Sequence, residues 1–136
     1  MTELPYTSLV TLLIGLLLFG TAANVGRARG LYGIKAPAVT GHEMFERAYR
    51  IQMNTLENAV LVLPTLWLYA GFMGDRSAAA LGALWLVARI WYAIAYQRDP
   101  KKRGAGFGLS MLAFGGLGLG ALWGVIRVFI QQYPGF

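Results

Sequence analysis

Residues 43–74 read EMFERAYRIQMNTLENAVLVLPTLWLYAGFMG, a charged and polar segment that continues directly into an uncharged, apolar one. Acidic residues come first, where the dipole of a helix favours negative charge, and no charge occurs from Asn58 to Gly74. We therefore predict one helix from Glu43 to about Met73, with Thr40 or His42 near its N-cap. It would begin among the lipid headgroups and then enter the bilayer.

Three further stretches are long and apolar enough to cross a bilayer. With the second helix at 43–73, they give approximate spans at 4–26, 77–97 and 106–129. The chain of 136 residues is 57% hydrophobic and only 13% charged, which is too apolar for an ordinary soluble domain. We predict an all-α protein, a single domain over 1–136 that forms an integral membrane four-helix bundle.

The lysines and arginines between spans indicate an orientation. The segments 27–37 and 98–104 are both basic, whereas the turn at 74–77 and the two termini are nearly neutral. Because basic loops stay on the cytoplasmic side of a membrane, we expect the first and third loops to be cytoplasmic. Both termini would then lie on the opposite side of this multi-pass protein.

Composition also excludes several kinds of chemistry. The chain has no cysteine, so it has no disulfide and no thiolate ligand or nucleophile of its own. A single histidine, His42, cannot form a multi-histidine metal site, and no metal is expected. The net charge of +6 comes from basic residues near span ends rather than from a polar basic domain, so nucleic acid is not an expected partner.

The polar part of the second helix forms one stripe. At about 100° per residue, its members fall within roughly 80° of one helix face; they are Glu43, Arg47, Arg50, Asn54 and Glu57. Charges at membrane depth are costly, so they usually face a protein interior or a wet cavity and pair with other groups. One interpretation is internal pairing, of Arg50 with Glu57 or of Arg47 with Glu43. The other is a binding site.

The third span repeats this geometry with Trp85, Arg89, Tyr92 and Tyr96 on one face. Arg89 lies well inside the span, and we expect a structural ion pair with an acid such as Glu57. With arginines at the ends of neighbouring spans, the cluster suits a small zwitterion that has more than one carboxylate. Glutathione has that charge distribution, and a nearby arginine would favour its thiolate.

The last span contains overlapping Gly-x-x-x-Gly spacings at Gly116, Gly120 and Gly124. Such small residues allow two helix backbones to approach closely. The pattern leaves open whether the neighbouring helix belongs to the same chain or to another subunit.

The motif Phe45-Glu46-Arg47-x-x-Arg50-x-Gln52-x-Asn54-x-x-Glu57, with Thr65-Leu66-Trp67 after it, resembles the second helix of the MAPEG family. These are the membrane-associated proteins in eicosanoid and glutathione metabolism. Ala88-Arg89-x-x-Tyr92-x-x-x-Tyr96 is similar to the family's third span. The resemblance implies a homotrimer that holds glutathione between protomers near the cytoplasmic face, while a lipophilic electrophile or lipid hydroperoxide enters from the bilayer.

The resemblance also implies residue roles. Glutathione binding is assigned to Arg29, Arg50, Asn54, Glu57, Tyr92 and Tyr96. Arg103 would be the catalytic residue that stabilises the glutathione thiolate, with Lys102 as the alternative if the register slips by one. Arg47 would have a structural role. Glutathione would then be a co-substrate. The resemblance implies a membrane-bound glutathione transferase, which can also have glutathione peroxidase activity.

Two positions depart from the leukotriene-synthesising members. Asn58 stands where those members have a tyrosine, and Gly30 stands where they have a second arginine. The departures favour a broader transferase or peroxidase for hydrophobic electrophiles, and the compact loops suit a bacterial member. The alternatives are a non-enzymatic lipid-binding scaffold of the same family, and a small exporter with Glu57 as its proton-coupling carboxylate. The arginines around Glu57 argue against proton cycling.

Overall fold

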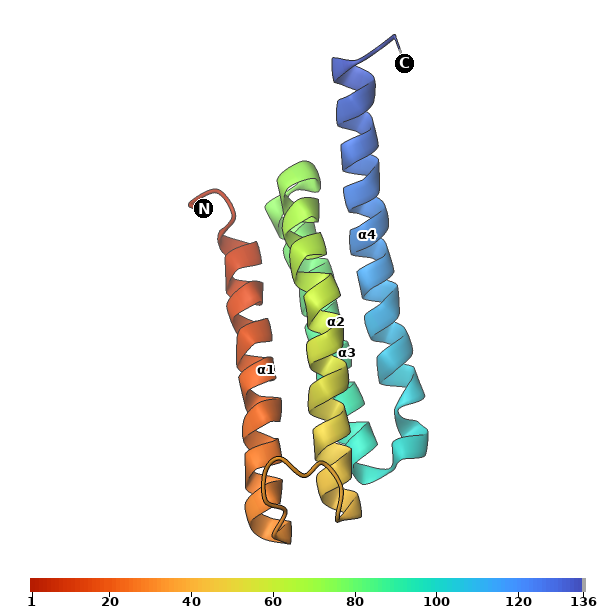
Figure 1. The fold of residues 1–136 in the computed structure, drawn as a ribbon. Coiled ribbons are helices and arrows are strands. Elements are labelled where there is room, and N and C mark those ends of the chain that lie inside the picture. Colours follow the sequence, from red (N-terminus) through yellow and green to blue (C-terminus); the bar gives the residue numbers. More distant parts are fainter. Residues whose placement is uncertain (136) are drawn as a thin grey trace.

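The computed structural model describes residues 1–135. Its elements are α1 (Pro5–Tyr32), α2 (Glu43–Met73), α3 (Asp75–Arg98), the short 3-10 helix η1 (Pro100–Lys102) and α4 (Gly104–Gln132). The four long helices run alternately up and down, as Figure 1 shows. Each is long and apolar enough to cross a membrane, which confirms the predicted all-α, four-span fold.

The central pair of the bundle is α2 and α3, and each of them packs against all three other long helices. The two ends of the chain lie at one end of the bundle, and the α1–α2 and α3–α4 connections lie at the other (Figure 1). The C-terminal part of α4 extends past the other three helices. The basic segments of the sequence are therefore gathered at the end of the bundle opposite the termini.

The core is apolar and close-packed, with Ile14, Val62, Leu66, Trp85 and Leu117 fully or almost fully buried. The outer surface is apolar as well, since Leu12, Leu112 and Leu119 are each more than 70% exposed. A soluble protein would hide such residues, whereas a bilayer accepts them.

The second helix has the predicted bounds. His42 is its N-cap, and the Nδ1 atom of His42 accepts a hydrogen bond from the Met44 N–H at 3.1 Å. Glu43 and Glu46 lie in the first turn. The helix continues through Pro64 to Met73, where Gly74 alone separates it from α3 with φ at 121°. The turn that we expected at 74–77 is thus a single residue, because glycine tolerates this positive φ.

The first helix is longer than predicted. The expected loop residues from Arg27 to Tyr32 continue α1, and the helix ends at Gly33 in the left-handed conformation with φ at 68°. Gly30 does not end the helix, because glycine lowers helix stability by only about 1 kcal/mol relative to alanine. The consequence is that Arg29 is held on a helix rather than on a loop.

A long-range contact caps the start of α1, which has no side-chain cap of its own. The Asp75 carboxylate accepts hydrogen bonds from the Tyr6 N–H at 3.0 Å and the Thr7 N–H at 2.8 Å. Free N–H groups at a helix start need acceptors and favour negative charge. The N-termini of α1 and α3 are thereby tied together.

The glycine pattern on α4 packs within the chain. A Cβ atom built on Gly120 would collide with the Tyr69 ring, and one on Gly124 would collide with Phe72, both on α2. Nearby, the Arg127 Nη2 atom donates to the Phe72 carbonyl at 3.0 Å. Gly120 and Gly124 thus allow the close α2–α4 contact, while Gly116 faces Leu81 of α3.

Candidate functional site

A pocket of about 310 Å³ lies between α2, α3 and the start of α4. Its lining residues are Arg50, Asn54, Tyr92, Arg103, Gly104 and Phe107. Four of these six belong to the predicted site. They come from α2, α3 and the N-cap of α4, and they meet because α2 and α4 both pack against α3 near the basic end of the bundle.

The pocket is electropositive. Both of its arginines, Arg50 and Arg103, are exposed, and the one ion pair within residues 1–135 joins Arg47 to Glu43 instead. Gly104 also places the first turn of α4 at the pocket, where unpaired N–H groups and the helix dipole favour anions. A ligand with carboxylate groups fits this environment, because guanidinium groups bind carboxylates bidentately.

Aromatic rings support the cationic residues. The Arg103 guanidinium lies over the Tyr96 ring, 5.5 Å from its centroid. The Tyr92 ring contacts both Tyr96, at a centroid distance of 5.7 Å, and Phe107, at 6.4 Å. Tyr96 is only 8% exposed and does not line the pocket. The Tyr96 ring therefore packs against Arg103 outside the pocket lining of this chain, and its predicted contact with glutathione stays a prediction.

Arg89 does not form the ion pair that we predicted with an acid such as Glu57. It is fully buried, and its Nη2 atom donates to Asn54 Oδ1 at 2.7 Å and to Thr55 Oγ1 at 2.9 Å. Its guanidinium also lies 4.0 Å from the centroid of the Tyr92 ring. The prediction was wrong because Thr55 faces the core while Glu57 lies on the exposed side of α2.

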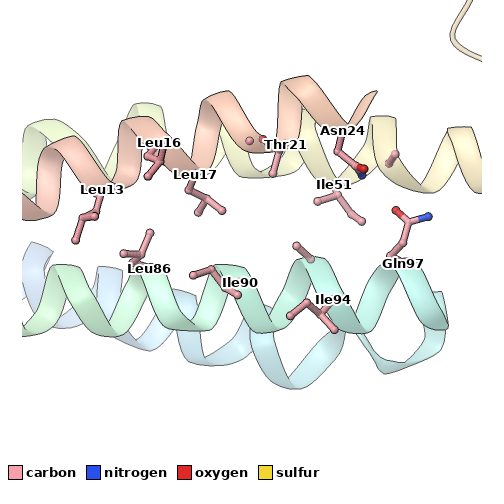
Figure 2. A pocket seen from close by; sticks show the side chains of 13 residues that line it. Leu13, Leu16, Leu17, Thr21, Asn24, Ile51, Leu86, Ile90, Ile94 and Gln97 are labelled. Carbon is pink, nitrogen blue, oxygen red and sulfur yellow. The ribbon is translucent and has the colours of Figure 1, made fainter. Parts of the chain in front are cut away.

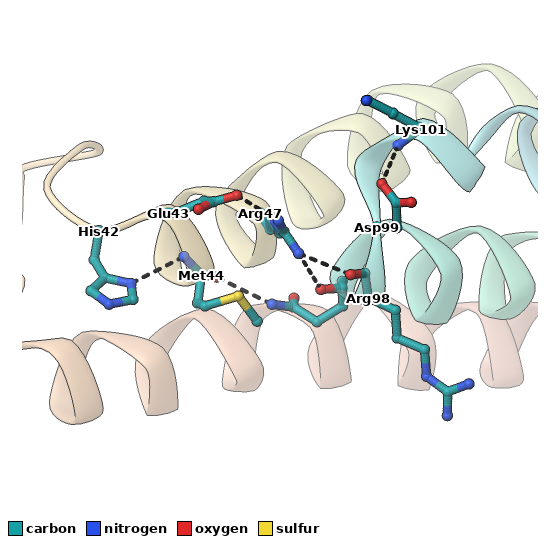
Figure 3. Close-up of polar contacts among 8 residues, drawn as sticks. His42, Glu43, Met44, Arg47, Arg98, Asp99 and Lys101 are labelled. Atoms are coloured by element: carbon teal, nitrogen blue, oxygen red, sulfur yellow. Dashed lines mark hydrogen bonds and ion pairs between the residues drawn. The ribbon is translucent and has the colours of Figure 1, made fainter.

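Arg47 is the other residue predicted to be structural, and its pairing with Glu43 is found. Its Nη1 atom also donates to the carbonyls of Gln97, at 3.0 Å, and Arg98, at 3.1 Å. Figure 3 shows these bonds at the end of α3. Arg47 thus caps the C-terminus of α3 and ties α2 to the connection that carries Arg103.

Besides Tyr96, two further predicted ligand residues lie outside the pocket lining in this single chain. Arg29 donates to the Ala38 carbonyl at 2.7 Å and lies over the Phe45 ring, 4.9 Å from its centroid. Glu57 is exposed on α2 and has no ion pair among the described residues. The alternative catalytic residue, Lys102, is exposed in η1 and does not line the pocket.

Sequence reasoning missed Gly104, Phe107 and Thr55. Phe107 follows Arg103 by one helical turn, so helical spacing from Arg103 was a signal that could have found it. Thr55 carried no such signal, because its role depends on how α2 turns toward α3.

A second hollow is apolar and lies on another face of the bundle. It has a volume of about 530 Å³ between α1 and α3, and it shares no lining residue with the arginine pocket. Its walls include Leu13, Leu17, Ile90 and Ile94 (Figure 2). The amides of Asn24 and Gln97 point toward one another at one end. We call this hollow the α1–α3 groove.

Fold and pocket together define a four-span membrane bundle with a cationic, aromatic-walled pocket near its basic end. Residues 7–123 match the model of the MAPEG family. The match covers most of the chain, so this chain belongs to the MAPEG family, as its helix-two motif indicated.

Individual relatives agree with this assignment. The chain is 46% identical over 125 residues to the uncharacterized protein sll1147 of Synechocystis, covering 92% of this chain and 91% of the relative. It is 35% identical to human microsomal glutathione S-transferase 2, covering 82% and 76% of the two chains. It is 36% identical to leukotriene C4 synthase of Cavia porcellus, covering 74% and 67%. A glutathione-related function is therefore supported.

Proposed function

We propose that this protein is a membrane-bound glutathione transferase that activates the glutathione thiolate for attack on lipophilic electrophiles. The observation that carries the proposal is that Arg50, Asn54 and Arg103 converge in one pocket where neither arginine has a carboxylate partner among residues 1–135. The relatives named as glutathione S-transferase and leukotriene C4 synthase support glutathione as the ligand.

The charges of glutathione suit the pocket. Arg50 would bind one of its carboxylates, while Glu57, which lies outside the pocket lining on the same exposed side of α2, would take its ammonium group. Arg103 would stand at the sulfur, where a positive charge lowers the pKa of a thiol and raises the population of thiolate. Tyr92 forms part of the wall, and Tyr96 supports Arg103 from below.

In the conjugation step the thiolate sulfur attacks the electrophilic carbon. A carbon–sulfur bond forms as the bond to the leaving group breaks, the leaving group departs with its electron pair, and the thiol proton passes to solvent. The increase in reaction rate would come from the lowered pKa of the glutathione thiol and from the positioning of the bound glutathione. A lipid hydroperoxide is the alternative substrate: two glutathiones would be oxidised to the disulfide as the hydroperoxide becomes an alcohol and water.

We further propose a homotrimer with its basic loops in the cytoplasm. Glu57 and Arg50 lie exposed on α2, and a charged group facing lipid costs several kcal/mol, at least about 2.5. A neighbouring protomer would cover this face, and its Arg29, which lies outside the pocket of its own chain, would contribute to the site. Cross-linking and mass measurement in detergent test this assembly.

The first experiment is a glutathione titration of the detergent-purified protein that follows thiolate absorbance in the ultraviolet. We expect a saturable signal that Arg103→Ala abolishes. The matched control is Lys102→Ala, which removes the adjacent exposed cation and should leave the signal in place. Absence of both thiolate signal and glutathione binding in the unaltered protein would overturn the proposal.

The α1–α3 groove favours a second candidate, a lipid-binding scaffold without enzymatic activity. Its apolar walls could hold an acyl chain, and the groove is separate from the arginine pocket. Gly20→Phe would fill the groove, since nothing lies within 4 Å of a Cβ at Gly20. A scaffold would lose lipid binding in this variant and would not conjugate glutathione to a chlorinated nitrobenzene, whereas a transferase would conjugate it.

A further inference from the structure

The contact between Arg89 and Asn54 joins a fully buried residue to a residue of the pocket. Arg89 has no exposed surface, and its Nη2 atom lies 2.7 Å from Asn54 Oδ1. Asn54 is partly exposed and lines the arginine pocket. Arg89 itself does not reach that pocket.

Chemistry fixes which end of the Asn54 amide faces Arg89. A guanidinium group can only donate hydrogen bonds, so the atom that meets it must be the amide oxygen. The Asn58 Nδ2 atom approaches the same oxygen at 3.4 Å and donates to the Asn54 carbonyl at 2.8 Å. Both neighbours therefore hold the amide in one orientation.

The other end of the amide is left free to bind a ligand. The Asn54 Nδ2 group has no hydrogen-bond partner among residues 1–135, and it is not one of their buried unpaired atoms. Since Asn54 lines the pocket, its NH₂ group is available there as a donor.

We propose that Arg89 is a positioning residue: it locks the Asn54 amide so that the NH₂ group donates to an oxygen acceptor of the bound ligand. This inference rests on the proposed function, in which that acceptor is a carboxylate or peptide carbonyl of glutathione. It replaces the ion-pairing role that the sequence predicted for Arg89. The burial of Arg89 ensures that no ligand atom competes for its contact with Asn54.

Asn54→Asp is the decisive variant. An aspartate keeps the size of Asn54 and can still accept from Arg89, but it has no donor for the pocket. Because the donor to the ligand oxygen is lost, we expect glutathione affinity to fall at least about tenfold. Unchanged affinity in Asn54→Asp would overturn the inference, because Asn54 would then be needed only as an acceptor.

Arg89→Met and Arg89→Lys test the positioning. In Arg89→Met the side chain has no donor, so the Asn54 amide can rotate and glutathione affinity should fall. In Arg89→Lys the ammonium group still donates to Asn54, so much of the glutathione affinity should be kept. Combining Arg89→Met with Asn54→Asp should lower affinity no further than Asn54→Asp alone. Val62→Ala, a core change outside the pocket, controls for general destabilisation and should leave affinity unchanged. Wild-type affinity in Arg89→Met would contradict the proposal.

Thermal unfolding separates this inference from the proposed function. In Asn54→Asp the new carboxylate pairs with Arg89, so Tm should hold or rise, while the same change in the Arg89→Met background should lower Tm. If the unaltered protein fails to bind glutathione, the proposed function fails, and this thermal comparison still decides whether Arg89 holds residue 54. Equal Tm changes in the two backgrounds would refute the contact.

Discussion

The Arg103 guanidinium lies 5.5 Å from the centroid of the Tyr96 ring. Tyr96, which does not line the pocket, therefore supports Arg103, which does. A cation held over an aromatic face gains about 0.5–1 kcal/mol at an exposed site. Tyr96→Phe keeps the ring and should conjugate glutathione within about twofold of the unaltered protein. Tyr96→Leu removes the ring and should lower kcat/KM by about two- to fivefold.

Steady-state conjugation rates on purified protein check this prediction. A direct role for the Tyr96 hydroxyl in binding glutathione would instead make Tyr96→Phe as poor as Tyr96→Leu. The pair of variants therefore separates support of Arg103 from contact with the ligand.

Arg50→Ala should weaken glutathione binding more than it alters chemistry. The Arg50 guanidinium lines the pocket and has no ion-pair partner in the described part of the chain. Loss of a charge-assisted hydrogen bond of about 1.5–3 kcal/mol predicts a Kd that rises by roughly 10- to 100-fold. Arg50→Lys keeps the charge without the bidentate geometry, so its Kd should lie between those of the unaltered protein and Arg50→Ala. Equilibrium titration measures Kd; an unchanged value would remove Arg50 from the site.

Arg47→Met should destabilise the bundle, because Arg47 caps the C-terminus of α3 through the carbonyls of Gln97 and Arg98. Glu43→Ala leaves the cap in place and removes an ion pair whose carboxylate partner is exposed, and such pairs contribute about 0–1 kcal/mol. We expect a clear fall of Tm in Arg47→Met and almost none in Glu43→Ala. Equal effects in thermal melts would show that the ion pair, rather than the cap, is what matters.

Gly106→Ala should disturb both stability and glutathione binding. A Cβ at this position would stand 2.6 Å from the Tyr92 backbone nitrogen, so α4 must move away from α3. Overpacking of this kind costs about 1–3 kcal/mol. Gly108→Ala is the matched control, since nothing lies within 4 Å of its Cβ, and alanine there should hold or raise Tm. Thermal melts with glutathione titrations test the pair; a harmless Gly106→Ala would disprove the close approach.

The amino-acid sequence was sufficient to predict the four helices and most of the pocket. Uncharged apolar runs of this length have few stable solutions other than membrane helices, because lipid leaves backbone groups no partner outside the helix. Helical spacing then placed Arg50 and Asn54 on one face of α2 and Tyr92 on one face of α3, and the family resemblance gave Arg103 its catalytic role. The positions of the helices and of these pocket residues could be predicted because they follow from local periodicity and from the placement of charges along the chain.

Tertiary structure alone decided which groups meet. Charge alone predicted an ion pair between Arg89 and an acidic residue. The rotation of α2 against α3 instead buries Thr55 and turns Glu57 outward, so Arg89 donates to the neutral oxygens of Asn54 and Thr55. The spacing of Gly120 and Gly124 did not reveal their partner, which packing shows to be α2. Hydropathy sets the length and depth of each helix, whereas side-chain packing sets its rotation and its neighbours. Only the folded chain therefore places the Asn54 amide between Arg89 and the pocket.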